Sequence, residues 1–177
     1  AEAFDHLEQA GKVRHFGVSN QNPMMMELLK TAVKQPLKVN QLQLSAAFTP
    51  SFEAGFHVNM EGPKAAVRDG SVFEYCRLTD TVIQAWSVLQ HGYFKGNFVG
   101  KEEFAALNHV LNDLAKKYQV TPTAIALAWV LRYPGKMQAV IGTTKPLHVL
   151  EAGKAATVTL TRKEWYQIYL AAGNDLP

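Results

Sequence analysis

The sequence predicts a parallel α/β fold built from four strand–helix units, which amount to half of an eight-stranded barrel. Four short apolar segments each stop at small polar residues, and helical segments separate them. This repeated order is typical of a parallel sheet or barrel, and it gathers the polar strand ends on the face where α/β proteins bind ligands. The four segments are residues 13–20, 39–41, 82–87 and 139–145.

The composition indicates one globular domain and narrows the class of partner. A chain of 177 residues fits a single domain over 1–177. Its net charge of +3 comes from scattered residues rather than from a basic run, which argues against nucleic acid as a partner. No apolar run approaches the ~20 residues that span a bilayer, so we expect no membrane segment. Cys76 is the only cysteine, which excludes an internal disulfide and favours a cytoplasmic location.

Stop and cap residues delimit the first helix, the first strand and the second helix. Gly11 follows a helical stripe that begins at Phe4, and glycine in this place is a typical helix end. An apolar strand is expected over about 13–18. Asn22 followed by Pro23 is typical of an N-cap and a first helical residue. The apolar stripe of this second helix is expected at Met25, Leu28, Leu29 and Ala32.

The second and third strands flank a long segment without clear periodicity. The second strand is expected over about 37–44, and the third over about 81–86. Residues 45–70 are rich in Phe, Gly, Pro and His, and a loop of this length is often functional. Ser71 and Glu74 form a capping-box pattern, which predicts a short helix before the third strand.

Further helices and the fourth strand complete the chain. The spacing of leucine and alanine predicts a helix around 107–115, and Thr121 opens another. A largely apolar run predicts that the fourth strand, 137–141, is buried, as parallel strands usually are. Thr161 and Glu164 form a second capping box before the last helix. The stripe that predicts a helix between the fourth strand and the last helix is Leu147, Val149 and Leu150.

The polar strand ends offer groups that suit the three parts of a nicotinamide dinucleotide. Residues 19–20 and 40–41 supply a hydroxyl and three amides, and paired donors and acceptors of this kind recognise a carboxamide. Trp86 supplies a flat apolar face that can stack on an aromatic ring. The segment 142–145 combines small residues with a lysine, and the free N–H groups at the following helix start favour a phosphate.

Each of these features also has a plainer interpretation. Ser19 and Asn20 could form an ordinary helix cap, and Gln41 could be a buried amide bonded to the backbone. A tryptophan such as Trp86 belongs more often to a core than to a stacking platform, and the turn at 142–145 is a common one. The order of the features and their shared position at strand ends favour the ligand site.

Five segments of the chain resemble the aldo-keto reductase family. Residues 11–20, 39–41, 85–89 and 140–145 are similar to the family's fifth, sixth, seventh and eighth barrel strands, and 126–131 is similar to its helix before the last strand. The resemblance covers essentially the whole chain and is strongest to a bacterial subgroup of oxidoreductases. It implies a TIM-type (β/α)8 barrel, of which this chain is the C-terminal half with strands five to eight. It also implies NADP(H), or in some members NAD(H), as the cofactor and small-molecule aldehydes or ketones as substrates.

By position, the resemblance implies a cofactor-binding role for a set of residues in this chain. The nicotinamide carboxamide is expected to bind to Ser19, Asn20 and Gln41. The nicotinamide ring is expected to stack on Trp86, which stands where the family often has a tyrosine. The contacts from the pyrophosphate through the 2′-phosphate to the adenine are expected at Ser87, Leu89, Gly142, Thr143, Lys145, His148 and Glu151. His148 stands where many members have arginine, and because histidine cannot make arginine's bidentate phosphate contact, the choice between NADP and NAD stays open.

The family's catalytic groups come from the first half of its barrel, which this chain does not match. They are a tyrosine, a lysine, an aspartate and a histidine, and no tyrosine of this chain lies in a corresponding motif. We therefore assign no catalytic residue and no metal ligand. A (β/α)8 barrel needs about 250 residues, and four strands cannot close. We expect the chain to be the cofactor-binding part of a longer reductase, with the absent N-terminal half as its partner and with no activity on its own.

Two alternatives remain open from the sequence. The chain could belong to a reductase-like binding or regulatory subunit that keeps the cofactor site without turnover. It could also be a half-barrel that pairs with a copy of itself.

Overall fold

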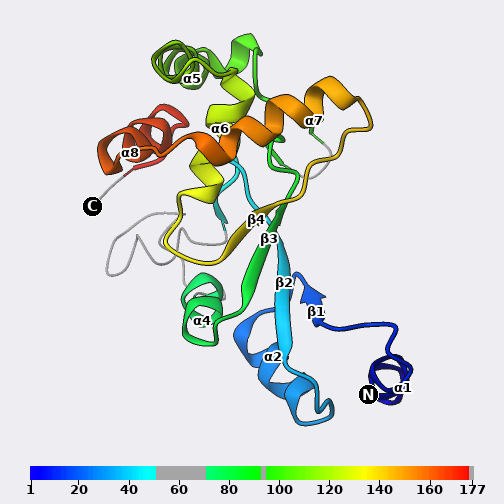
Figure 1. Ribbon diagram of the computed structural model, residues 1–177. Helices are drawn as coiled ribbons and strands as arrows, with labels where there is room; N and C mark the ends of the chain where they lie inside the picture. Colours follow the sequence, from blue (N-terminus) through cyan, green and yellow to red (C-terminus); the bar gives the residue numbers. More distant parts are fainter. Residues whose placement is uncertain (51–70, 93–94, 176–177) are drawn as a thin grey trace.

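A sheet of four parallel strands runs through the middle of the molecule (Figure 1). The computed structural model describes residues 1–50, 71–92 and 95–175. The strands are β1 (Phe16–Ser19), β2 (Leu37–Gln43), β3 (Val82–Trp86) and β4 (Met137–Ala139). Their order in the sheet is their order in the chain, and every neighbouring pair is parallel. All four carboxyl ends therefore lie at one edge of the sheet, as the sequence predicts.

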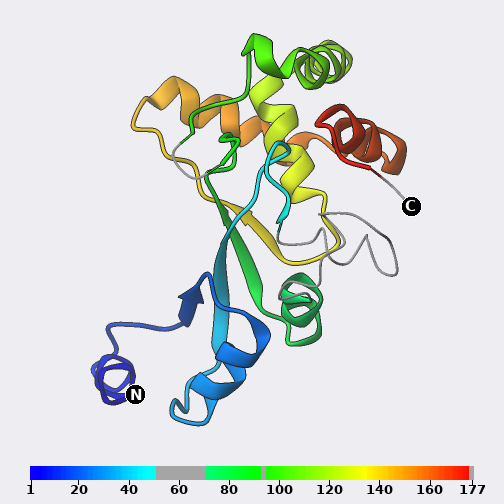
Figure 2. The same cartoon turned by 180° about the vertical axis from the view of Figure 1, so that it is seen from behind.

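Helices connect the strands and gather in two groups. Figures 1 and 2 show α5 to α8 at one end of the sheet and α2 with α4 toward the other, while α1 stands apart near the N-terminus. The helices are α1 (Glu2–Gln9), α2 (Pro23–Lys30), α4 (Val72–Leu78), α5 (Ala105–Tyr118), α6 (Pro122–Leu131), α7 (Pro146–Gly153) and α8 (Arg162–Ala171), with 3-10 turns at η1 (Glu102–Phe104) and η2 (Lys154–Thr157).

Hydrogen bonds confirm three of the predicted helix starts. At the start of α2, the Asn22 side chain accepts the N–H of Met25 at 2.8 Å. Thr121 caps α6 in the same way, as the sequence predicts. Thr161 and Glu164 make both bonds of a capping box at α8. These caps satisfy backbone N–H groups that have no partner within their own helix.

Three expectations about individual elements are wrong. Ser71 has a left-handed φ of 74° and its side chain makes no cap bond, so the capping box predicted for α4 does not form. In α2 the buried residue is Met26, whereas Leu28 of the predicted stripe is 72% exposed. The strand β4 ends at Ala139 and its side chains are half-buried or exposed. It is less buried than predicted because it is an edge strand of the described sheet.

One face of the sheet packs on the helices and forms the main core. Leu42 from β2, Leu44 just after it, and Ile83 and Ala85 from β3 are buried there. The helix α6 lies against them, and its residues 124–130 are all buried. A helix that is apolar on every side belongs in an interior, which explains its unbroken run of alanine, leucine and isoleucine. The opposite face of the sheet carries polar side chains that are described with the site.

Two tryptophans join α6 to α8. The rings of Trp129 and Trp165 stack with their centroids 4.8 Å apart and an interplanar angle of 10°. Each indole N–H donates to the backbone carbonyl of the other residue at 3.0 Å. Because both polar N–H groups are satisfied, the two large rings can be buried without an unpaired donor.

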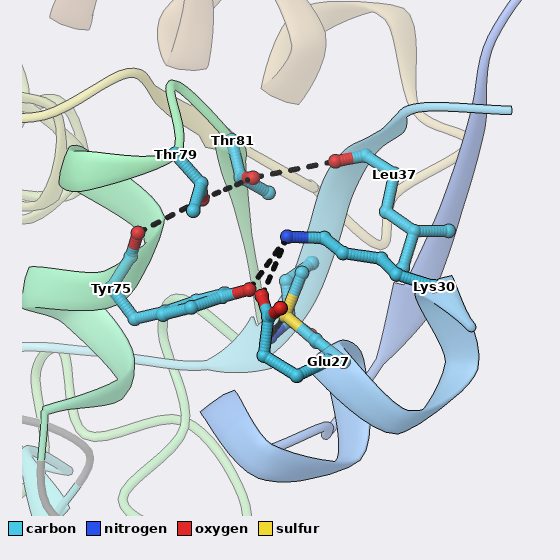
Figure 3. A network of polar contacts seen from close by, with 8 residues as sticks. Glu27, Lys30, Leu37, Tyr75, Thr79 and Thr81 are labelled. Carbon is cyan, nitrogen blue, oxygen red and sulfur yellow. Dashed lines mark hydrogen bonds and ion pairs between the residues drawn. The ribbon is translucent and has the colours of Figure 1, made fainter.

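A polar network attaches α2 and α4 to the amino ends of β2 and β3 (Figure 3). Lys30 Nζ donates to the Tyr75 hydroxyl at 2.6 Å and to a Glu27 carboxylate oxygen at 2.8 Å. The Thr81 hydroxyl donates to the backbone carbonyl of Leu37 at 3.3 Å. This tyrosine–lysine contact therefore joins two helices at the end of the sheet opposite the polar strand ends.

Gly17 is required by the close approach of β1 to β2. A Cβ at this position would lie 2.7 Å from both Cβ and the carbonyl oxygen of Val39, and the register between the two strands shifts just before Gly17. We expect Gly17→Ala to lower the free energy of unfolding by about 1–3 kcal/mol, because the added methyl overpacks a backbone contact. Urea denaturation of the intact protein measures this change. Gly153→Ala is the control, since nothing lies within 4 Å of its added Cβ; an equal loss of stability in both variants would contradict the steric explanation.

Candidate functional site

The polar residues that follow β1 are held against the end of β2. Ser19 and Gln41 are direct neighbours in the strand register. The Ser19 hydroxyl donates to the Gln41 backbone carbonyl at 3.1 Å, and the Asn20 N–H donates to the same carbonyl at 2.9 Å. The helix cap is made by Asn22 instead. The alternative interpretation of residues 19–20 as an ordinary helix cap is therefore wrong.

The two adjacent amides of β2 face opposite sides of the sheet. Asn40 is fully buried, and its Nδ2 donates to the Gln21 carbonyl at 2.8 Å while its Oδ1 accepts the Gln21 N–H at 3.4 Å. It therefore holds the turn that follows β1. Gln41 is half-buried on the other face, and its Nε2 donates to Gln84 Oε1 at 3.4 Å. Since that partner is a side chain, the alternative of a buried amide bonded to the backbone is wrong.

Trp86, the last residue of β3, lies between two cavities. It lines a cavity of 540 Å³ together with Asn20 and Met25, and it also lines a second cavity of 680 Å³ that extends to α7. Its indole N–H donates to Asn20 Oδ1 at 3.4 Å. The side chain is half-buried. Trp86 thus forms a wall shared by two cavities, whereas an ordinary core tryptophan would be enclosed.

The larger cavity brings together seven residues of the predicted site. They come from the end of β3, from the segment after β4 and from α7, and they are Trp86, Ser87, Leu89, Gly142, Thr143, His148 and Glu151. Asn20 lines the smaller cavity. Ser19, Gln41 and Lys145 do not line the 680 Å³ cavity. Because strand ends separated by more than 50 residues in the sequence meet here, the arrangement depends on the parallel sheet.

The segment before α7 forms a small polar turn. Thr143 Oγ1 accepts the N–H of Lys145 at 3.2 Å and lies 3.4 Å from Nδ1 of His148. Lys145 is the N-cap residue of α7, it is exposed, and no ion pair to an acidic residue is formed by it within the described part of the chain. The helix start and the lysine together favour an anion.

Two turns next to Trp86 have left-handed backbone conformations. Asn20 and Ser87 both have a φ of 52°, a conformation that side chains other than glycine adopt uncommonly. Asparagine tolerates it better than serine. Each residue directly follows a strand, so the chain turns sharply at the carboxyl ends of β1 and β3. Such turns are enriched at ligand sites, and no sequence pattern marked the one at Ser87.

The sequence interpretation missed a row of polar side chains that crosses the whole sheet. Register pairs Ser19 with Gln41, Gln41 with Gln84, and Gln84 with Gln138, so each strand contributes one residue. The Gln84 Nε2 donates to Gln138 Oε1 at 2.9 Å. We call this set, Ser19, Gln41, Gln84 and Gln138, the polar row. Its side chains are half-buried or exposed on the face opposite the main core.

The tyrosines that the structure describes lie away from both cavities. Tyr75 bonds to Lys30, Tyr118 bonds to Glu164, and Tyr169 is fully buried. No tyrosine lines the 540 Å³ or the 680 Å³ cavity among the described residues. Tyr93 and the segment 51–70 lie outside the described residues.

Residues 1–50, 71–92 and 95–175 contain no group of three His, Cys, Asp or Glu side chains that could hold a metal ion. Within the same ranges, no helix combines the length and the apolar character needed to cross a bilayer.

Comparison with known proteins identifies the class. Residues 1–171 match the aldo/keto reductase family, and the chain therefore belongs to this family of oxidoreductases. It is 33% identical over 177 residues to 6-dehydroglucose reductase of Agrobacterium fabrum, and this alignment covers 99% of this chain and 52% of that protein. It is 32% identical over 179 residues to the oxidoreductase YdhF of Escherichia coli, with 100% and 53% covered. The chain thus spans about half the length of the curated relatives it matches.

Solved structures with the same fold are aldo-keto reductases. One from Klebsiella pneumoniae, solved in complex with NADPH, aligns with a TM-score of 0.69 and 21% identity over 94% of this chain and 51% of its own. A thermostable aldo-keto reductase in complex with the inhibitor epalrestat aligns with a TM-score of 0.69 and 20% identity over 96% and 53%. At these identities the likeness shows the fold alone. The predicted fold class is confirmed, because the four parallel strands and their helices match half of a (β/α)8 barrel.

Proposed function

We propose that the chain, over residues 1–177, is the C-terminal, cofactor-binding half of an NADP(H)-dependent aldo-keto reductase that interconverts small carbonyl compounds and alcohols. The observation that carries this proposal is the position of Trp86. It contacts Asn20 at the end of β1 and lines the same cavity as Ser87, Thr143 and His148. A flat ring, amide groups and a basic turn thereby follow one another along the carboxyl edge of the sheet.

The polar groups next to Trp86 complement a carboxamide. The Asn20 Oδ1 accepts the indole N–H, which leaves Asn20 Nδ2 as a donor. Gln41 Nε2 donates to Gln84, which leaves Gln41 Oε1 as an acceptor. A carboxamide presents one acceptor oxygen and an NH₂ donor, so its oxygen would bind Asn20 and its NH₂ would bind Gln41. Ser19 is held beside them by its bond to the Gln41 carbonyl. These residues therefore fit the nicotinamide end of the cofactor.

The opposite end of the larger cavity suits a phosphate and an adenine. Beside this cavity, Lys145 and the N–H groups at the start of α7 would supply positive charge for the 2′-phosphate, next to Gly142 and Thr143, which line it. Ser87 and Leu89 would follow the pyrophosphate. Glu151 would lie near the adenine, whose amino group can donate to a carboxylate. NADP(H), when bound, supplies or accepts the hydride, and the residues of this chain bind and orient it.

The remaining half of the barrel is the partner in this proposal. It would cover the face of the sheet that carries the polar row and would contribute the catalytic acid, so this chain alone would be inactive. A cytoplasmic location is part of the same proposal and is supported by Cys76, which is a free thiol, as is usual in a reducing compartment.

Substitutions at the basic turn test the assignment of the 2′-phosphate. We expect Lys145→Met in the intact protein to weaken NADPH binding about 5- to 20-fold and to leave NADH binding within about 2-fold, because one charge-assisted hydrogen bond is lost. His148→Arg is expected to strengthen NADPH binding about 10-fold, because arginine can contact the 2′-phosphate through two hydrogen bonds. Calorimetric titration with both cofactors measures the two effects. Equal changes for NADPH and NADH would contradict this location of the 2′-phosphate, and a parent protein that binds neither would overturn the proposed function.

A further inference from the structure

We infer that Gln84 and Gln138 are positioning residues that fix which end of the Gln41 amide faces the nicotinamide carboxamide. This inference rests on the proposed function and adds two residues that act through a third. It follows from the polar row, in which β2, β3 and β4 contribute Gln41, Gln84 and Gln138 at the same level of the sheet.

The strand register places the three glutamines side by side. Their Cα atoms are direct partners across β2, β3 and β4. Neighbouring parallel strands lie about 4.8 Å apart, which is the spacing at which stacked glutamine amides bond to one another. Gln41 Nε2 donates to Gln84 Oε1 at 3.4 Å, and Gln84 Nε2 donates to Gln138 Oε1 at 2.9 Å. We call these two hydrogen bonds the glutamine ladder. Both of its donors point in one direction, from β2 toward β4.

The direction of the ladder decides what Gln41 offers to a ligand. An amide has a donor end and an acceptor end, and Gln84 engages only the donor end of Gln41. Gln41 Oε1 then remains to accept the NH₂ of a carboxamide. If Gln41 were free to rotate about its last torsion, either end could face the ligand, and the site would lose its preference for the NH₂. Bonds in such a chain also polarise one another, so the bound carboxamide would strengthen the ladder.

Substitutions of Gln84 distinguish its orienting effect on the Gln41 amide from a simple effect of charge on cofactor binding. Glu at position 84 can only accept, so it holds Gln41 in the same orientation. Lys at position 84 can only donate, so it turns the Gln41 oxygen away from the ligand. The anionic cofactor would by charge alone favour the lysine variant and disfavour the glutamate variant. If the hydrogen bonds to Gln84 orient Gln41, the order is reversed for the carboxamide. Its contribution to the affinity is then larger in the glutamate variant than in the lysine variant.

The experiment compares two ligands in the intact protein by calorimetry. One is NADP⁺ and the other is its 3-acetylpyridine analogue, in which a methyl group replaces the carboxamide NH₂. The parent is expected to prefer NADP⁺ about 5- to 10-fold, the size of one hydrogen bond. This preference is expected to persist in Gln84→Glu and to fall below about 2-fold in Gln84→Lys and Gln84→Met. Gln138→Met, one step further along the ladder, is expected to lower it by a smaller factor.

The outcomes distinguish the two levels of the proposal. An unchanged preference in Gln84→Lys and Gln84→Met would overturn the positioning role while NADP⁺ binding, and with it the proposed function, remained. A parent that binds both ligands equally would also overturn it, because Gln41 would then not accept from the NH₂. A parent that binds neither would overturn both. A loss of affinity that is equal for the two ligands in every Gln84 variant would indicate a purely structural role and would contradict the inference.

Discussion

Trp86→Ala is expected to weaken NADPH binding about 5- to 150-fold, because stacking a base on an aromatic side chain contributes about 1–3 kcal/mol. The residue lines both cavities and contacts Asn20, so its removal takes away the platform on which the nicotinamide ring would lie. Calorimetric titration of the intact protein is the appropriate measurement, since it does not depend on tryptophan fluorescence.

Two comparisons make the Trp86 test specific. Trp86→Tyr keeps a flat aromatic face and is expected to retain affinity within about 5-fold of the parent, a difference of at most about 1 kcal/mol. A ligand without the nicotinamide, 2′-phospho-ADP-ribose, is expected to bind Trp86→Ala and the parent alike. If Trp86→Ala bound NADPH as tightly as the parent, the stacking role would be wrong.

Glu164→Ala is expected to lower the free energy of unfolding by about 3 kcal/mol, because it removes a buried carboxylate that joins α8 to α5 and completes the capping box of α8. The side chain of Glu164 is 8% exposed, and its carboxylate accepts from Lys117 Nζ at 2.6 Å. It also accepts from the Tyr118 hydroxyl at 2.8 Å and from the N–H of Thr161 at 2.8 Å. The substitution therefore removes the Glu164 half of the capping box, while Thr161 still caps α8, and it removes the bonds that join α8 to α5.

The same carboxylate makes stability depend on pH in the acid range. Burial alone would raise the pKa of Glu164, but the hydrogen bonds from Lys117, Thr161 and Tyr118 outweigh it and lower the pKa from 4.5 to about 2. Because the pKa of Glu164 is lower in the folded state, the ionised carboxylate stabilises the fold. Its full contribution is present above pH 4.5, the pKa in the unfolded chain, and it is lost as the pH falls from there to about 2. The shift corresponds to about 2–3 kcal/mol once screening at the exposed lysine is allowed for.

Urea denaturation at several pH values measures both Glu164 effects. Glu164→Gln is the matched control, because glutamine also completes a capping box but cannot ionise. We expect Glu164→Gln to show a weaker dependence of stability on pH between 4.5 and 2 than the parent. An identical pH dependence in the two proteins would show that another group titrates in this range.

The sequence predicted the elements well where the signals are local. Asn22, Thr121 and Thr161 marked helix starts correctly because a cap depends on bonds to residues two or three positions away. Ser71 carried the same pattern but adopts a left-handed backbone, so its side chain cannot reach the N–H groups of α4. Met26 rather than Leu28 is buried because the orientation of α2 is set by what it packs against, which its own periodicity does not contain.

In the candidate site, too, the sequence carried the local motifs but not the contacts between distant residues. The sequence offered Asn40 and Gln41 together as amides for a carboxamide, but only the packing showed that Asn40 is buried and bonded to Gln21. The polar strand ends were visible as motifs, and the sequence related them to a nicotinamide dinucleotide by their order. That Trp86 bonds to Asn20 and shares a cavity with His148 required the parallel sheet.

By itself, the sequence determined the four strand–helix units and the membership of a reductase-like barrel, because these depend on short-range patterns and on matching segments. Only the tertiary structure decided which side chains meet. Gln84 and Gln138 are 54 residues apart in the chain and carry no motif, but strand register places them in one hydrogen-bonded row with Gln41. Register is set by contacts between distant strands, so no local pattern in the sequence could have revealed it.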